Sequence, residues 1–228
     1  QNRLANSLGN PAWDTTGGRF GPFAGQMFVG DQTQSNLMRV GSERVGGIEQ
    51  GWAVPFASGL ASGVMRPAFL QDGSLLLGQV GRGWRAKGGA VSSLQRVWRA
   101  SEGSVSAIHS VATEADGFRL ELTAPAREGS RLADAVSIES WTYRDAPDYG
   151  SDALTERLEG VEAASLSADR RTLRLRLATT DLPEAHPEQL GRVYRIRLDG
   201  EALWGVRVET GAEAFVTVHR FPEADSDE

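Results

Sequence analysis

One stretch decides the fold, and it reads Gly63-Val64-Met65-Arg66-Pro67-Ala68-Phe69-Leu70-Gln71-Asp72-Gly73-Ser74-Leu75-Leu76-Leu77-Gly78-Gln79-Val80. Two short apolar runs, 63–69 and 74–80, flank the pair Asp72-Gly73. Asp-Gly suits a two-residue turn because both central positions can adopt positive φ. The stretch therefore predicts a β-hairpin with glycines at its corners.

The same pattern continues on both sides of this hairpin. Further strands are predicted at 26–30, 36–40 and 94–98, with a turn at 31–35. Strand, turn and strand at this spacing, with glycine at the corners, is typical of propeller blades. About two blades fit between Phe20 and Arg99, whereas a closed propeller needs roughly four to eight. We therefore expect an incomplete ring, which another chain or a missing segment completes.

The second half of the chain has longer strands that alternate more cleanly. Seven strands are predicted, at 107–111, 118–123, 135–143, 161–166, 172–178, 193–198 and 215–219. From Leu173 to Leu177, leucines alternate with arginines, which is the period of two that buries one face of a strand. Seven short strands separated by turn residues fit an immunoglobulin-like β-sandwich. Residues 152–158 are interpreted as a single helical turn.

These patterns predict an all-β protein with three parts. Residues 1–102 are expected to be C-terminal β-propeller blades, and residues 103–222 a β-sandwich. Residues 223–228 form an acidic tail that we expect to lack regular structure.

Composition limits the protein further. With 228 residues and 40% hydrophobic content, the chain can bury a core. No run approaches 18 apolar residues, so no transmembrane segment is expected, and the N-terminus lacks the layout of a signal peptide. A start at Gln1 is expected either for a processed piece or for an arbitrary boundary. The absence of cysteine excludes disulfides, thiolate metal sites and covalent haem attachment within the chain.

The charge is distributed unevenly. Residues 1–100 carry ten basic and five acidic side chains, and residues 101–228 carry fourteen and twenty-five. Phosphate binding needs concentrated basic charge, so nucleic acid is not an expected partner. The basic first half could attract small anions, although its arginines are scattered and solvated faces also explain them.

A resemblance covers most of the chain from Phe20 to Leu198. The strings that carry it are Phe20-Gly21-Pro22-Phe23-Ala24-Gly25-Gln26-Met27-Phe28-Val29-Gly30-Asp31-Gln32, Gly59-Leu60-Ala61-Ser62-Gly63-Val64-Met65-Arg66, Asp72-Gly73-Ser74-Leu75, Arg82-Gly83-Trp84, Leu94-Gln95-Arg96, Asp116-Gly117-Phe118 and Tyr149-Gly150-Ser151. The chain resembles large secreted bacterial proteins with a glucose/sorbosone dehydrogenase-like propeller, often joined to a haem-binding domain. The resemblance implies a periplasmic or secreted protein.

The resemblance also implies a chemistry. In the related soluble quinoprotein sugar dehydrogenases, pyrroloquinoline quinone lies over the propeller with calcium and a catalytic His, and hydride leaves a sugar C1 hydroxyl. A Lys and an Arg-x-Arg pair hold the quinone carboxylates, since fixed cations compensate buried anions. Here the Lys position corresponds to about Thr33 and the Arg pair to Val64 and Arg66. Only Arg66 retains the needed chemistry, and the expected His lies outside the chain, so the catalytic residues are unknown.

The loop Gly81-Arg82-Gly83-Trp84-Arg85-Ala86-Lys87-Gly88-Gly89 is the other candidate for cofactor binding. It packs three cations and an indole among glycines, where an anion or a sugar could approach. With Arg66, its Arg82, Trp84, Arg85 and Lys87 are the predicted cofactor-binding residues. The alternative is that Trp84 fills the gap between blades while the cations are solvated.

Two further candidates have structural alternatives. Asp31 is the predicted calcium ligand, although the chain offers no dense acidic loop beside it. A second candidate is Asp72, but its role in the Asp-Gly turn is sufficient to explain an aspartate at this position. Trp141, Tyr143 and Tyr149 could form a sugar platform or could belong to the core and edge of the sandwich.

Two functions are therefore expected. The first is the C-terminal segment of an extracytoplasmic sugar or polyol dehydrogenase-like propeller protein, without a complete active site in this chain. The quinone and calcium would then belong to the complete protein. The alternative is a non-catalytic structural or interaction subunit of a larger extracytoplasmic assembly, and a carbohydrate-binding module is a third possibility. The expected partners are the remaining blades, a haem-binding domain or a larger protein complex.

Overall fold

The computed structural model describes residues 4–81, 85–100, 103–144, 152–182 and 189–224. These residues form fifteen strands and two short helices, so the all-β prediction is confirmed. The chain divides into two compact units: unit 1 holds residues 1–41 and 53–105, and unit 2 holds residues 42–52 and 106–228. The border predicted after residue 102 thus lies after residue 105, and the assignment of 42–52 to unit 2 was not predicted.

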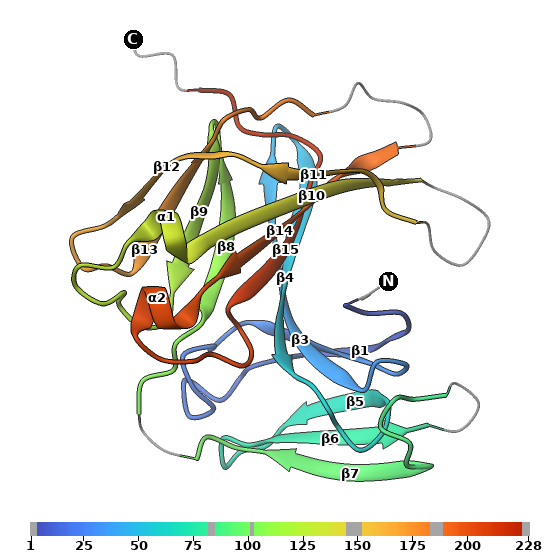
Figure 1. Ribbon diagram of the computed structural model, residues 1–228. Coiled ribbons are helices and arrows are strands. Elements are labelled where there is room, and N and C mark those ends of the chain that lie inside the picture. Colours follow the sequence, from blue (N-terminus) through green and yellow to red (C-terminus); the bar gives the residue numbers. More distant parts are fainter. Residues whose placement is uncertain (1–3, 82–84, 101–102, 145–151, 183–188, 225–228) are drawn as a thin grey trace. The chain divides into compact units, whose positions relative to one another are not determined.

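Unit 1 contains the first strands of an eight-stranded antiparallel sheet that continues into unit 2, and a three-stranded antiparallel sheet (Figure 1). Its strands are β1 (Leu8–Trp13), β2 (Met27–Asp31), β3 (Asn36–Val45), β4 (Ile48–Ala57), β5 (Val64–Phe69), β6 (Leu75–Val80) and β7 (Ser92–Val97). Strands β1 to β4 are neighbours in the first sheet, and β5, β6 and β7 form the second. Both predicted hairpins are present, with β2 paired to β3 and β5 paired to β6. Strands β3 and β4 continue into unit 2.

The turn of the central hairpin differs in detail from the prediction. The Gly73 N–H donates to the Leu70 carbonyl at 3.0 Å, and the Leu70 N–H donates to the Ser74 carbonyl at 2.8 Å. This closes a three-residue loop, in which Gly73 has a φ of +86°. A turn followed by one left-handed glycine is the usual solution for this loop length. Only one of the two central residues therefore needs a positive φ.

The core of unit 1 is a cluster of phenylalanines between its sheets. Phe28 on β2 lies edge-on to Phe20 and Phe69, with ring centroids 5.6 and 5.3 Å away. The sheets approach so closely that a Cβ on Gly30 would clash with the Val64 side chain. The buried members of the cluster are Phe20, Phe23, Phe28, Leu37, Leu60, Val64, Leu75 and Leu77.

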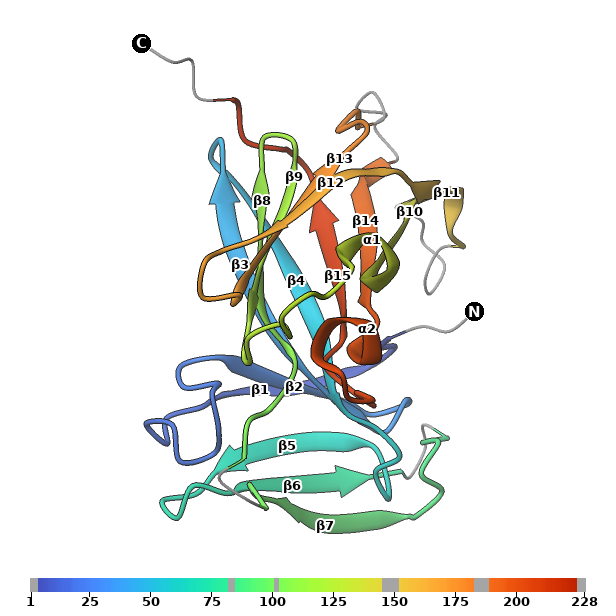
Figure 2. The same cartoon turned by 60° about the vertical axis from the view of Figure 1, so that its left-hand side comes forward.

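Unit 2 also has two layers of strands (Figures 1 and 2). Its elements are β8 (Ile108–Glu114), β9 (Gly117–Leu122), α1 (Leu132–Ala135), β10 (Val136–Arg144), β11 (Leu154–Glu159), β12 (Val161–Leu166), β13 (Thr172–Leu177), β14 (Gln189–Leu198), α2 (Gly200–Trp204) and β15 (Glu213–Val218). One sheet has the order β12-β13-β9-β8, and β15, β14, β10 and β11 follow β4 in the other. Phe118 and Tyr194 join the two sheets, with ring centroids 5.1 Å apart.

The seven strands predicted for this half are all present. Along β13 the leucines are buried and Arg174 and Arg176 are exposed, as the alternation predicted. Residues 152–158 were wrongly interpreted, because Leu154–Glu159 is strand β11 and not a helical turn. The helices α1 and α2 were not predicted, and in α2 the Asp199 carboxylate caps two backbone N–H groups. No helix in the described ranges is long and apolar enough to cross a membrane.

Candidate functional site

Asp31, the predicted calcium ligand, closes the turn between β2 and β3. Its side chain is fully buried. One carboxylate oxygen accepts the N–H groups of Asn6 and Ser7 at 2.6 and 2.5 Å, and the other accepts the Gln34 N–H at 2.6 Å. These bonds supply a structural reason for a buried carboxylate, because charge-assisted bonds to backbone N–H groups offset its desolvation. Calcium binding by Asp31 stays a prediction.

The loop that contains Arg85 and Lys87 is fixed against this same turn. The Lys87 N–H donates to the Thr33 carbonyl at 2.9 Å, and the Gly88 N–H donates to the Ser35 hydroxyl at 3.0 Å. The side chains of Arg85 and Lys87 are exposed, and Arg85 has a left-handed φ of +48°. The structure therefore brings Lys87 next to Thr33, the position at which the family resemblance places a lysine.

Arg66 on β5 has different neighbours. Its guanidinium donates to the Asn10 side chain and, at 3.5 Å, to the Met65 carbonyl. No hydrogen bond or ion pair recorded for the described side chains joins Arg66 to Lys87. Arg82 and Trp84 lie outside the described residues. Of the five predicted cofactor-binding residues, Arg85 and Lys87 therefore lie in one loop. Arg66 makes its contacts with other residues, Asn10 and Met65.

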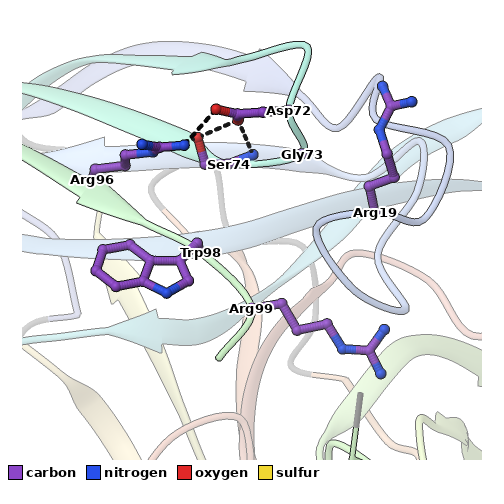
Figure 3. A pocket seen from close by; sticks show the side chains of 7 residues that line it. All are labelled: Arg19, Asp72, Gly73, Ser74, Arg96, Trp98 and Arg99. Atoms are coloured by element: carbon purple, nitrogen blue, oxygen red, sulfur yellow. Dashed lines mark hydrogen bonds and ion pairs between the residues drawn. The ribbon is translucent and has the colours of Figure 1, made fainter. Parts of the chain in front are cut away.

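A pocket in unit 1 gathers residues that sequence reasoning missed (Figure 3). Its volume is about 370 Å³, and it is lined by Arg19, Asp72, Gly73, Ser74, Arg96, Trp98 and Arg99. The Asp72 carboxylate accepts the Ser74 N–H at 2.9 Å and the Ser74 hydroxyl at 2.6 Å. Arg96 donates to the Ser74 hydroxyl oxygen at 2.9 Å and forms an ion pair with Asp72. These contacts among Asp72, Ser74 and Arg96 orient the Arg96 guanidinium, one of the three arginines of the pocket.

The electrostatics of the pocket are positive but weak. Hydrogen bonds from Ser74 hold the pKa of Asp72 below its usual value, and the charges of Arg96 and Arg19 act in the same direction. The Arg96 side chain is 51% exposed, so solvent screens its ion pair. Figure 3 shows that the guanidinium groups of Arg19 and Arg99 point away from Arg96. The pocket can attract an anion, but its cations do not converge on one point.

Unit 2 holds a second polar cluster, and this one is buried. Glu159 accepts a hydrogen bond from Arg157 at 2.7 Å, and Arg192 lies 3.8 Å from the same oxygen. Both Arg192 and Glu159 have side chains less than 5% exposed. Arg192 also donates to the Thr155 carbonyl at 2.8 Å. Burial lowers the pKa of Arg192, with the nearby Arg157 as a second cause. These contacts join β11 to β14, and the Ser140 hydroxyl of β10 also donates to Glu159, so we interpret the cluster as structural.

Of the aromatic side chains proposed as a sugar platform, Trp141 makes a contact with another aromatic ring. On β10, Trp141 alternates with the buried Ser140 and Thr142, so it lies on the face opposite to the core and is half-buried. Its ring meets Phe215 edge-on, with centroids 6.4 Å apart and an interplanar angle of 72°. Phe215 was not part of the proposed platform, so a sugar platform at Trp141 and Tyr143 stays a prediction. Tyr149 lies outside the described residues.

Neither a metal cluster nor a related protein assigns a function to these residues. In the part of the chain that the structure describes, no group of three or more His, Asp or Glu side chains is arranged to hold a metal ion. Comparisons with protein-family models, with curated proteins and with solved structures found no match.

Proposed function

We propose that this chain is the C-terminal part of an extracytoplasmic propeller protein of the sugar or polyol dehydrogenase type, and that it holds no complete active site. In this proposal, β1–β4 and β5–β7 are two successive blades, and unit 2 is an immunoglobulin-like sandwich. The packing of β1–β4 against β5–β7 over a phenylalanine core supports the blade assignment, because successive blades of a propeller pack face to face. The first of these blades also continues past β4 into the eight-stranded sheet.

The observation that carries the proposal is the outer face of the β5–β6–β7 sheet. Ladder pairing places Ala68, Leu76 and Arg96 in one row across this face, and Arg66, Gly78 and Leu94 in the next. Leu94 is 69% exposed, and Trp98, which follows β7, is 64% exposed. Leu94 and Trp98 thus expose apolar surface beside Arg66 and Arg96, and apolar surface bordered by polar groups is typical of an interaction site. We propose that the next blade covers this face.

The cofactor assignment is only partly supported by the residues present. Lys87 supplies a cation beside Thr33, where the family resemblance places a lysine. Arg66 supplies one cation of the expected Arg-x-Arg pair. Asp31 has a structural role, and no catalytic His is identified among the described residues. The residues of this chain alone do not complete a site for pyrroloquinoline quinone and calcium. In the proposal, the other blades therefore supply the remaining groups, and the catalytic step takes place on the complete ring.

The second candidate function is a non-catalytic structural or interaction subunit of a larger extracytoplasmic assembly, for example beside a haem-binding domain. The composition of the described surface favours it. Unit 2 carries fifteen basic and twenty-six acidic residues, and many of them form ion pairs on strand faces. Exposed charge in such ladders is typical of a solvated or docking surface and provides no reactive group.

Dye reduction by the complete polypeptide distinguishes the two functions. The first function predicts sugar- or polyol-dependent reduction of a redox dye when the quinone and calcium are added. It also predicts that Arg66→Ala with Lys87→Ala lowers this activity at least tenfold, whereas Arg44→Ala, an exposed arginine of unit 2, leaves it unchanged. Inactivity with a broad sugar panel contradicts the first function. Full activity of the double variant removes Arg66 and Lys87 from the site.

A further inference from the structure

The edges of the sheets differ in a way that points to a binding site. The three sheets of the described residues end in six edge strands, which are β1, β11, β12, β8, β5 and β7. Five of these strands have a register shift in the ladder that ties them to their sheet. β1 and β5 also contain a proline, Pro11 and Pro67. Bulges and prolines blunt an edge against pairing with another strand.

Strand β7 has none of these devices. Its ladder with β6 runs without interruption through six consecutive pairs, from Leu75 opposite Val97 to Val80 opposite Ser92. Neither proline nor lysine occurs in the strand. A long regular edge is a template for another strand, and natural proteins blunt such an edge unless it is paired. The contrast with the five other edges therefore indicates that β7 is used for pairing.

The backbone groups that point outward from β7 can be identified. The Gly81 N–H donates to the Val91 carbonyl at 2.9 Å, so these two residues form a hydrogen-bonded pair at the start of the ladder. Hydrogen-bonded pairs alternate along an antiparallel ladder. The N–H and C=O groups of Ser92, Leu94 and Arg96 therefore point away from β6. Figures 1 and 2 both show β7 as the outermost strand of its sheet.

The side chains beside this edge define the chemistry of a partner. Ser92, Leu94 and Arg96 are exposed, and they lie on the sheet face opposite to the phenylalanine core. From Val91 to Ala100 the chain contains two arginines and no carboxylate. Arg96 forms an exposed ion pair with Asp72, and Arg19 and Arg99 line the same pocket, so the net charge beside this edge is positive. A pairing strand is therefore best matched when it carries an apolar residue beside Leu94 and an acidic residue near these arginines.

From this edge we infer that β7 binds an extended polypeptide segment that lies outside residues 1–228, by strand addition. The segment alternates apolar with polar side chains and contains at least one Asp or Glu. Ser92, Leu94 and Arg96 supply one backbone donor and one acceptor each, which is the usual source of affinity in this binding mode. A second copy of the chain is a poorer occupant, because it brings two arginine-bearing, carboxylate-free edges together. The inference concerns an edge and does not depend on the covered face or the catalytic function proposed above.

The test uses a library of random decapeptides displayed on phage, selected on the 228-residue chain. Selected peptides are expected to alternate apolar residues and to contain Asp or Glu. Binding of a labelled selected peptide is then measured with Leu94→Pro, which removes an outward N–H without removing a donor to β6. The matched control is Leu94→Thr, which keeps the N–H group. We expect roughly tenfold weaker binding for the proline variant and less than threefold for the threonine variant.

Hydrogen exchange provides a readout that does not depend on the variants folding. The amides of Ser92, Leu94 and Arg96 are expected to exchange rapidly in the free chain and to be protected when the peptide binds. A library without binders, protection confined to other strands, or equal binding by both variants overturns the inference. Self-association that Leu94→Pro abolishes would identify a second copy as the occupant and would overturn the partner assigned to this edge.

Discussion

Arg39 is the largest fully buried side chain in the described part of the chain. Its guanidinium donates to the Gln26 side-chain oxygen at 2.7 Å and lies 4.3 Å from the centre of the Phe23 ring. Burial lowers the pKa of Arg39, yet a guanidinium remains protonated at neutral pH. The amide oxygen and the ring face offset part of the cost of burying this charge. Arg39 therefore acts as a large core residue with a polar end.

Substitution of Arg39 separates its volume from its charge. Arg39→Ala is expected to lower the free energy of unfolding by about 2–4 kcal/mol, because it leaves a cavity under β3. Arg39→Met fills much of that space without a charge to desolvate and is expected to change stability by less than about 1.5 kcal/mol. Urea unfolding measures both. Equal losses in the two variants would mean that the charge, not the volume, is needed.

The stability of unit 2 is expected to fall at alkaline pH because of Tyr194. Burial raises the pKa of its phenol from 10.0 to about 12, with the Glu159 charge as a second cause. The folded state therefore holds the phenol proton more tightly than the unfolded state. The corresponding stability is present below pH 10 and is lost as the pH rises from about 10 through 12. Tyr143, whose pKa burial also raises, acts in the same direction.

Tyr194→Phe tests this dependence. We expect the variant to lose less stability than the wild-type chain between pH 9 and about 11.5, because Phe has no proton to lose. Urea midpoints measured at pH 8, 10 and 11 give the comparison. The same slope in both proteins would show that Tyr194 does not contribute to the alkaline loss.

At the scale of single residues, the sequence predicts the chemical role of a residue better than it predicts which residues lie next to it in the fold. The Asp72 turn was expected, but its link to Arg96 arises only when β7 pairs with β6 and brings residues 24 positions apart together. Burial of Arg39 could not be expected, since arginine is usually exposed. Position along the chain does not reveal such tertiary partners.

At the scale of elements, the tip of the β3–β4 hairpin is tied into unit 2 by side chains. The Glu43 carboxylate accepts the Thr113 N–H at 3.0 Å and hydroxyl at 2.8 Å, and also a hydrogen bond from Gln50 at 3.1 Å. The Gln50 side-chain oxygen accepts the N–H groups of His219 and Arg220 at 3.0 and 3.2 Å. Gln50 is buried, so its amide depends on these partners, whereas His219 and Arg220 lie at the surface.

Gln50→Leu is therefore expected to destabilise unit 2 by about 1–3 kcal/mol, because it removes the hydrogen-bond partner of two backbone N–H groups and one of the partners of the Glu43 carboxylate. The control is Glu49→Gln on the same hairpin, whose ion pair with Arg44 is exposed and is expected to contribute little. Thermal and urea unfolding measure both variants. A loss as large in the control as in Gln50→Leu would contradict the assignment of the network as the anchor.

Most of the elements that the sequence predicted have one buried face. β13 shows this most clearly, since its leucines all face the core. β7 is an exception, because none of its residues is buried. β1 and β11 were missed because they lack a clean alternation, whereas β4 was missed although its buried Gln50, Trp52 and Val54 alternate with less buried residues. β11 has only one buried residue, Glu159, and β1 has none. A strand at an edge needs no apolar face, and its sequence therefore carries little signal.

At the scale of the whole molecule, the chain crosses between its two units three times, after residues 41, 52 and 105. Neither unit is therefore a single consecutive stretch of the chain. We expect a fragment of residues 103–228 to fold poorly, because it lacks the hairpin tip that pairs next to β15 and satisfies Gln50's partners. Circular dichroism and amide NMR spectra of the fragment measure this. A native-like, cooperatively folded fragment would contradict it.

The two units also differ in charge, which the sequence predicted well. Unit 1 carries nine basic and four acidic residues, and unit 2 fifteen and twenty-six. The predicted site residues were only partly gathered, since Lys87 and the Asp31 turn meet through backbone bonds while Arg66 contacts Asn10. The charge of each unit can be counted directly from the sequence. Which loops lie next to each other depends on tertiary packing, which the sequence pattern does not show.

The central proposal, that another blade covers the outer face of β5–β6–β7, can be tested by labelling one introduced thiol. The chain contains no cysteine, so Leu94→Cys gives a single reactive site, and Leu158→Cys, at a residue 75% exposed in unit 2, controls for reagent access. Labelling rates are compared between the 228-residue chain and the complete polypeptide. We expect the thiol at position 94 to react at least tenfold more slowly in the complete polypeptide, with no such change at position 158. Equal rates at position 94 in both proteins would contradict the proposal.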